Sequence, residues 1–217
     1  LPNSATHYEK EAFNNCTSLT KVLFQANSYI SVNDGSIFTG CSNLTTFTVD
    51  ENNKNYKVNN NLLTSLDGLT IYLATNGFNY NEYIIPEGYE YIAEGAFSGI
   101  NTLTKLTISD DIKVIGQRAF ENCKNLTDVV LPNKEIEILS YAFNNCSSLE
   151  NIDLSKIKTD NVENMKFVFY QCYSLRTLDL LHFNTSNVIT MGEMFRECKN
   201  LETILISNWN TSKLENI

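Results

Sequence analysis

One spacing recurs along the whole chain and constrains its fold more than any other feature. A Phe is followed by Cys three residues later, by Leu six residues later, and by apolar residues nine and eleven residues later. Repetition of this kind is typical of a solenoid, in which each unit buries its apolar side only by stacking on its neighbours. Seven stretches obey the spacing, and they start at Phe13, Phe38, Phe97, Phe120, Phe143, Phe169 and Phe195.

The cysteines all belong to this repeat. Six of the seven stretches carry the Cys, the chain has six cysteines, and the remaining stretch has Ile100 in the same place. Because Ile replaces Cys there, we interpret the position as one that requires an apolar side chain. The sequence therefore predicts buried free thiols that behave as small hydrophobic groups.

A degenerate unit lies between the second and third complete stretches. In "ATNGFNYNEYIIPEG" the three apolar positions fall on Tyr80, Tyr83 and Ile85. The chain also begins inside one repeat and ends inside another, at "WNTSKLENI". We therefore interpret residues 1–217 as a single solenoid and as a fragment of a longer protein.

Each unit is expected to contribute one strand and one turn. Stretches such as "LTKLTI" and "LENIDL" end in a two-residue alternation, which is the period of a half-buried strand. The Phe and Cys, three residues apart, fit a short helical or 3-10 turn. The prediction is an α/β repeat with a parallel β-sheet on one face and helical or 3-10 turns on the other.

Two further features modify this picture. Ile92, Ile115 and Ile138 each precede a Phe by five residues, which indicates another short extended side and a roughly triangular cross-section. An insertion near residues 58–74 has alternating runs on either side of Asp67-Gly68, and this pattern predicts a β-hairpin.

The repeat pattern changes near residue 155. Residues 1–154 carry the Phe-Cys-Leu units, whereas residues 155–217 follow a strict 26-residue period that includes Met. Inward-facing apolar residues are expected there on a helical segment, at Val162, Met165, Val168, Val188, Met191 and Met194.

Composition and motifs exclude several classes of function. Sixteen basic and 25 acidic residues give a net charge of −9, and no basic cluster is present, so we expect no nucleic acid or anionic membrane as partner. No apolar run approaches the length needed for direct insertion into a membrane. No phosphate loop or nucleophile motif occurs, and we expect no catalytic site and no cofactor.

Metal and disulfide alternatives exist for the cysteines. No two cysteines have the spacing of zinc ligands, and the only histidines, His7 and His182, lie in unrelated places, so we expect no metal site. Stacked neighbours such as Cys146 and Cys172 are near enough in the predicted array to leave a disulfide open. Side chains at equal repeat positions point in the same direction, which favours free thiols.

The motifs resemble a known family. The "AF-x-x-C-x-x-L-x-x-L-x-L" units, together with the insertion, are similar to the BspA-like leucine-rich repeats of bacterial surface proteins. The C-terminal copies resemble methionine-containing repeats that often follow them. This resemblance implies a horseshoe or solenoid at the cell surface or secreted, in a family linked to adhesion to host or matrix proteins or other microbes.

Outward strand positions are the candidate site. We expect a protein or glycan partner to bind the open sheet face, and the alternative is a structural spacer without a ligand of its own. Asp153 and Asp179 are predicted to be cross-strand neighbours whose repulsion would favour a cation or a basic group. The full set of candidates is Lys21, Thr46, Glu82, Lys105, Asp128, Asp153, Thr177 and Asp179.

Overall fold

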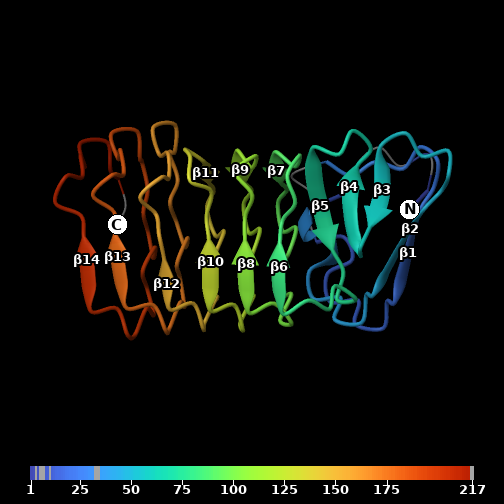
Figure 1. The fold of residues 1–217 in the computed structure, drawn as a ribbon, viewed down its shortest axis with the longest axis horizontal. Coiled ribbons are helices and arrows are strands. Elements are labelled where there is room, and N and C mark those ends of the chain that lie inside the picture. The colour runs from blue at the N-terminus through green and yellow to red at the C-terminus, as the bar shows by residue number, and fades with distance from the viewer. Residues whose placement is uncertain (3, 5–7, 10, 32–34, 216–217) are drawn as a thin grey trace.

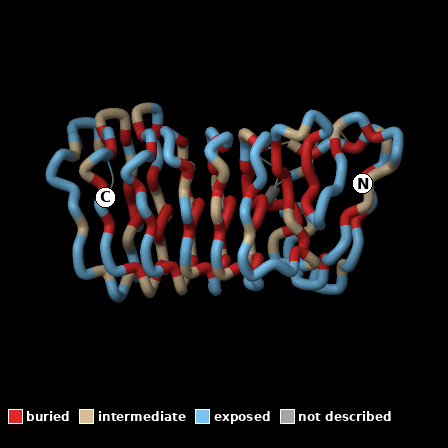
Figure 2. The backbone as a smooth tube through the Cα atoms, viewed as in Figure 1, coloured by how far each residue is buried: buried red, intermediate tan, exposed pale blue. Residues whose placement is uncertain are grey.

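The chain is a β-solenoid of about eight turns. The computed structural model describes residues 1–217 apart from 3, 5–7, 10, 32–34 and 216–217. The turns are stacked along one long axis, with the N-terminal and C-terminal turns at opposite ends (Figure 1). The buried residues recur in each turn and line the interior of the winding (Figure 2).

The first set of strands carries the alternating segments of the repeat. The central sheet has the parallel order β12-β10-β8-β6, with bounds Asn151–Ile152, Asp128–Val130, Lys105–Thr107 and Glu82–Ile84. Two parallel pairs continue this row at the ends: β1 (Lys21–Phe24) with β2 (Thr46–Val49), and β13 (Thr177–Asp179) with β14 (Thr203–Leu205). Leu106 and Val129 face the core, while Lys105 and Asp128 face solvent. The predicted parallel sheet is confirmed.

A second sheet forms the further extended side that the sequence predicts. Its order is β11-β9-β7-β5-β4-β3, with bounds Glu137–Ile138, Val114–Ile115, Tyr91–Ile92, Thr70–Ala74, Leu62–Ser65 and Tyr56–Asn59. Ile92, Ile115 and Ile138 pair in register and are buried, which confirms the predicted extended side.

The insertion forms two consecutive hairpins. Strands β4 and β5 pair antiparallel around Asp67-Gly68, as predicted, and Gly68 has a φ of 84° that favours glycine. Strand β3 pairs antiparallel with β4 across a tight turn at Asn60 and Asn61, whose φ angles are 48° and 62°. Two positive φ angles match the turn that connects twisted antiparallel strands, and Asn tolerates them.

The Phe-Cys segments form a third wall made of tight turns. Residues two before and two after the Phe adopt positive φ, for example Arg118 (57°) and Asn122 (62°) around Phe120. A helix of L-residues requires negative φ at successive positions, so this alternation prevents one. The prediction of helical or 3-10 turns is therefore wrong for this wall. The described residues contain a single 3-10 helix, η1 (Gly35–Phe38).

Backbone hydrogen bonds between turns hold the third wall together. The Phe97 N–H donates to the carbonyl oxygen of Ala119 at 2.8 Å, and the Phe120 N–H donates to that of Ala142 at 2.9 Å. The Gly99 N–H likewise donates to Glu121 at 2.7 Å. This ladder satisfies buried backbone groups that have no sheet partner.

The repeat Phe side chains form an interior spine. The rings of Phe97, Phe120 and Phe143 stack on one another with centroid separations of 5.4 and 5.5 Å, and all three are fully buried. The predicted apolar rows at Val162, Met165, Val168, Val188, Met191 and Met194 are also buried. These segments contain turns and the isolated bridge Asn164↔Thr190, so the predicted helix is wrong there as well.

Candidate functional site

The predicted strand-face residues lie on outward rows of three sheets. Lys21 pairs with Thr46 on β1 and β2, and Lys105 lies between Glu82 and Asp128 on the central sheet. All five are exposed, and the Lys105 Nζ lies 3.7 Å from the Glu82 Oε1. The rows therefore present a flat, mixed-charge surface on a rigid backbone.

The two aspartates predicted to face each other across a ladder do not do so. Strand β12 ends at Ile152 and pairs with β10, whereas β13, which holds Thr177 and Asp179, pairs with β14. Each carboxylate accepts a hydrogen bond from the backbone N–H of the residue two positions further along the chain. Ser155 donates to Asp153 at 2.9 Å, and Leu181 donates to Asp179 at 3.0 Å. The prediction of a cross-strand pair is wrong. The hydrogen bonds from Ser155 lower the pKa of Asp153.

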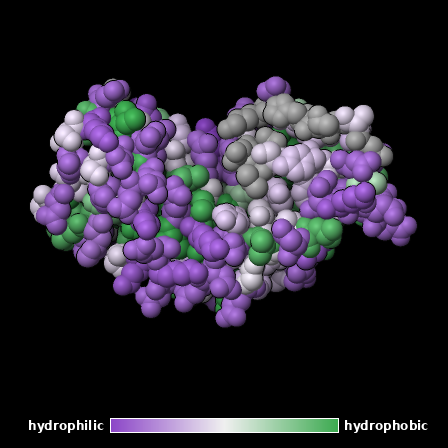
Figure 3. Space-filling model, turned by 90° about the horizontal axis from the view of Figure 1, so that it is seen from above, coloured by the Kyte–Doolittle hydropathy of each residue, from purple (hydrophilic) through white to green (hydrophobic). Residues whose placement is uncertain are grey.

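Apolar residues on the same sheet face were not anticipated. The side chains of Ile84 and Val130 are 68% and 57% exposed, and they lie on either side of Thr107 in register. Each is the last residue of a three-residue strand and faces solvent. In the sequence each lies in a run of apolar residues, which gives no sign of its exposure. Hydrophilic side chains nevertheless cover most of the molecule when it is seen from above (Figure 3).

A column of stacked side chains runs along the third wall. The Arg118 guanidinium lies 4.5 Å from the ring centroid of Tyr141, and Tyr141 stacks on Phe167 at 4.7 Å with an interplanar angle of 15°. Phe167 meets Tyr170 edge to face at 5.4 Å. We call these four half-buried residues the aromatic column.

A buried carboxylate fixes one end of the aromatic column. Glu121 is 7% exposed, lies 3.4 Å from the Arg118 Nη1, and accepts a hydrogen bond of 2.6 Å from the Asn144 Nδ2. None of these residues was predicted as a site residue, because all the predicted candidates lie at outward strand positions. The available signal was the residue two before each Phe, which is Arg118, Tyr141 and Phe167 in successive repeats.

Five of the six cysteines donate hydrogen bonds to backbone carbonyls of the preceding turn, whereas Cys16 is exposed, so the prediction of a buried thiol is wrong for that residue. All six are free, and four are buried: Cys41, Cys123, Cys146 and Cys172. The Cys123 Sγ donates to the Phe97 carbonyl at 3.1 Å, and the Cys146 Sγ donates to the Phe120 carbonyl at 3.2 Å. Burial raises the pKa of Cys123 to about 12, so it remains a neutral thiol at physiological pH. The cysteine position thus supplies a weak donor as well as volume.

No group of three or more His, Cys, Asp or Glu side chains among the described residues could hold a metal ion. His182 is exposed, and His7 lies outside the described residues. No helix in the described part of the chain is long and apolar enough to cross a membrane.

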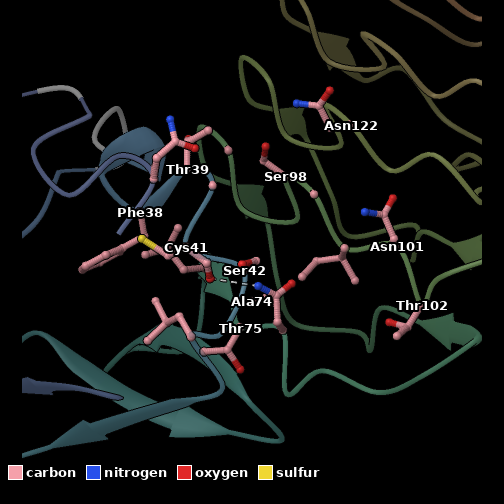
Figure 4. Close-up of a pocket in the computed structure, with 18 of the residues that line it drawn as sticks. Phe38, Thr39, Cys41, Ser42, Ala74, Thr75, Ser98, Asn101, Thr102 and Asn122 are labelled. Atoms are coloured by element: carbon pink, nitrogen blue, oxygen red, sulfur yellow. Dashed lines mark hydrogen bonds between the residues drawn. The ribbon is translucent and has the colours of Figure 1, made fainter. Parts of the chain in front are cut away.

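A cleft of about 660 Å³ opens where the third wall is interrupted. It lies between the turn at Phe38 and the turn at Phe97, and the hydrophobic core divides into two clusters in the same region. Ser98, Asn101 and Asn122 lie opposite Thr39 and Cys41 across the cleft (Figure 4).

The degenerate unit accounts for this opening. Tyr83 pairs with Leu106 as predicted and Ile85 is buried, but Tyr80 is 39% exposed and does not fill its core position. By the same register, Ala74 and Gly77 occupy the Phe and Cys positions. Phe78 partly restores the spine, with its ring centroid 5.6 Å from that of Phe97.

Comparisons with known proteins agree with this architecture. A family model described as BspA type leucine rich repeat region matches residues 1–74, 72–202 and 159–217, in six copies. No curated protein matches the chain.

Solved structures share the fold. A leucine-rich cell surface protein from Faecalibacterium prausnitzii is 25% identical, with a TM-score of 0.70 over 95% of this chain and 52% of that one. A leucine-rich repeat protein from Eubacterium ventriosum is 19% identical, with a TM-score of 0.63 over 92% of this chain and 59% of that one. The pneumococcal vaccine antigen PcpA is 18% identical, with a TM-score of 0.60 over 90% and 46%.

The chain thus spans about half the length of the solved structures that it matches. The family model covers the sequence from end to end, and the structure has the repeated strand and turn that the motif requires. The chain belongs to the BspA type leucine-rich repeat proteins, a family with bacterial cell surface members.

Proposed function

We propose that this chain is a non-catalytic recognition module of a bacterial surface protein, located at the cell surface or secreted, and that it binds a protein partner. The observation that carries the proposal is the aromatic column at Arg118, Tyr141, Phe167 and Tyr170. Membership of a family with cell surface proteins supports the location.

The chemistry of the column suits protein recognition. Tyr and Arg are enriched among the residues that contribute most binding energy at protein interfaces. The column is stacked and fixed by Glu121 before any partner arrives, so little side-chain entropy remains to be lost on binding.

The open sheet face is a second surface for the same function. Lys21, Thr46, Glu82, Lys105, Asp128, Asp153, Thr177 and Asp179 remain its candidate residues. The exposed Ile84 and Val130 add apolar area beside them. A glycan partner at this face and a spacer role are the alternatives.

The test is binding of the chain to a panel of immobilised extracellular-matrix proteins by surface plasmon resonance. The column variant is Tyr141→Asn with Phe167→Asn, because Asn tolerates the positive φ of 62° and 59° at these positions. The matched control on the sheet face is Lys105→Ala with Asp128→Ala.

We expect the column variant to weaken binding at least about tenfold, which corresponds to about 1.4 kcal/mol, and the control to bind like the wild type. Weakening by the control alone would move the site to the sheet face. Absence of wild-type binding to every protein in the panel would favour the spacer.

A further inference from the structure

The interruption of the third wall follows from the path of the degenerate turn. The Asn76 N–H donates to the Leu44 carbonyl of the preceding turn at 2.8 Å. A Cβ at Gly77 would collide with the backbone carbonyl of Thr45, so only glycine allows this close approach. The degenerate turn therefore lies closer to the preceding turn than the other Phe-Cys segments do. As a result, the third wall has no segment between the turns at Phe38 and Phe97.

The missing segment leaves backbone groups without their usual partners. Elsewhere the N–H two residues after the Phe donates to the next turn, as Asn15 does to Thr39 and Asn122 does to Asn144, both at 2.8 Å. At the cleft the equivalent donor is the Gly40 N–H, and the equivalent acceptor is the Ser98 carbonyl. Neither makes a backbone hydrogen bond to any described residue.

Side chains around the cleft offer further donors and acceptors. Asn101 and Asn122 use their Oδ1 atoms to accept hydrogen bonds from Lys124 and Asn145, which leaves their Nδ2 groups for a ligand. Asn76 donates its Nδ2 to the Cys41 carbonyl and keeps its Oδ1 as an acceptor.

The lining formed by the described residues is uncharged and amphipathic. Its polar groups are carboxamides, hydroxyls and backbone, its apolar part includes Phe47, Leu73 and Ile100, and none of the described residues that line it carries a charged side chain. A charged ligand would therefore lose its hydration without gaining an ion pair. A purely apolar ligand would leave the amides unsatisfied.

We propose that the cleft binds a short neutral oligosaccharide. Sugar hydroxyls both donate and accept hydrogen bonds, which matches the mixture of free N–H and C=O groups, and the C–H faces of a sugar ring fit the apolar part of the lining. The cleft volume of about 660 Å³ lies within the range of roughly 300–1,000 Å³ that is usual for small-ligand sites. The net charge of −9 adds a general repulsion against anionic glycans.

A glycan array tests this assignment. The labelled chain is applied to printed neutral, sialylated, sulfated and uronic-acid oligosaccharides, and each neutral hit is then titrated by calorimetry. The blocking variant is Ser98→Trp, because Ser98 is half-exposed at the edge of the cleft. Arg196→Trp is the control, because Arg196 holds the same position after its Phe in a turn away from the cleft.

We expect neutral glycans alone to bind, with at least a tenfold loss for Ser98→Trp and less than a twofold change for Arg196→Trp. If Ser98→Trp does not fold, as judged by circular dichroism, Thr39→Trp blocks the opposite side. Absence of neutral hits, equal binding of acidic glycans, or unchanged affinity in the blocking variants would overturn the proposal.

The outcome is independent of the aromatic column. The variant Tyr141→Asn with Phe167→Asn should bind glycans like the wild type, since neither residue lines the cleft. A different result would refute the glycan proposal: no glycan binds, but a peptide from a library binds the wild type and not Ser98→Trp. That result would assign the cleft to protein chains.

Discussion

Replacement of Phe120 by Ala tests how the solenoid obtains its stability. The Phe120 ring is fully buried, and it stacks on Phe97 at 5.4 Å and on Phe143 at 5.5 Å. Truncation of a buried Phe costs about 3–5 kcal/mol, and each lost aromatic pair adds about 0.5–1.5 kcal/mol. We therefore expect the free energy of unfolding to fall by about 6 kcal/mol, at the middle of these ranges with two aromatic pairs lost.

Two matched variants make the test specific. Phe13 is only half-buried, stacks on Phe38 at 5.4 Å and meets Tyr8 in a tilted contact at 6.4 Å, so Phe13→Ala should cost about half as much. Phe120→Leu keeps most of the volume and should cost about 1.5 kcal/mol. Urea denaturation followed by circular dichroism measures all three. Equal costs at Phe13 and Phe120 would refute a spine stabilised by neighbouring turns.

Two further variants probe local features. Gly116→Ala should destabilise the chain by about 1–3 kcal/mol in urea denaturation, because the new Cβ would lie 2.7 Å from the Ile92 carbonyl oxygen, and an unchanged midpoint would contradict that close approach. Asp153→Asn should flatten the dependence of unfolding free energy on pH. Since its folded-state pKa is lowered, the aspartate stabilises the fold above its unfolded pKa, and this contribution is lost as pH falls through the folded value. Parallel pH curves for the variant and the wild type would show that Asp153 contributes nothing measurable.

The repeat made the buried rows predictable. A period that returns Phe, Cys and Leu to equivalent places identifies the interior, and the row at Ile92, Ile115 and Ile138 indicated the second sheet. The Asp67-Gly68 hairpin followed from turn chemistry. Arg118 and Tyr141 have positive φ, but residues of these types rarely do, so nothing in the sequence indicates it. The spacing of Phe and Cys therefore predicts a helical turn where the structure has tight turns.

The candidate surfaces were harder to predict because they depend on how neighbouring turns stack and on one turn that lacks its Phe-Cys segment. The cleft exists because the degenerate unit approaches the preceding turn closely at Gly77 and does not build its part of the third wall. In the sequence, this unit looks like one more repeat. The aromatic column joins residues in neighbouring turns that look unrelated until the turns are stacked. Outward residues obey no packing rule, so their spacing alone does not indicate which of them gather.

The central claim is that the Phe and Cys rows form the inner wall, which leaves recognition to outward residues and to the break in that wall. Titration with a thiol reagent tests this claim most directly. In denaturant six thiols should react. In the native protein the exposed Cys16 should react first and the half-buried Cys198 more slowly, while the buried Cys41, Cys123, Cys146 and Cys172 should wait for unfolding. Fewer than six thiols in denaturant, or rapid reaction of all six in the native state, would contradict the account.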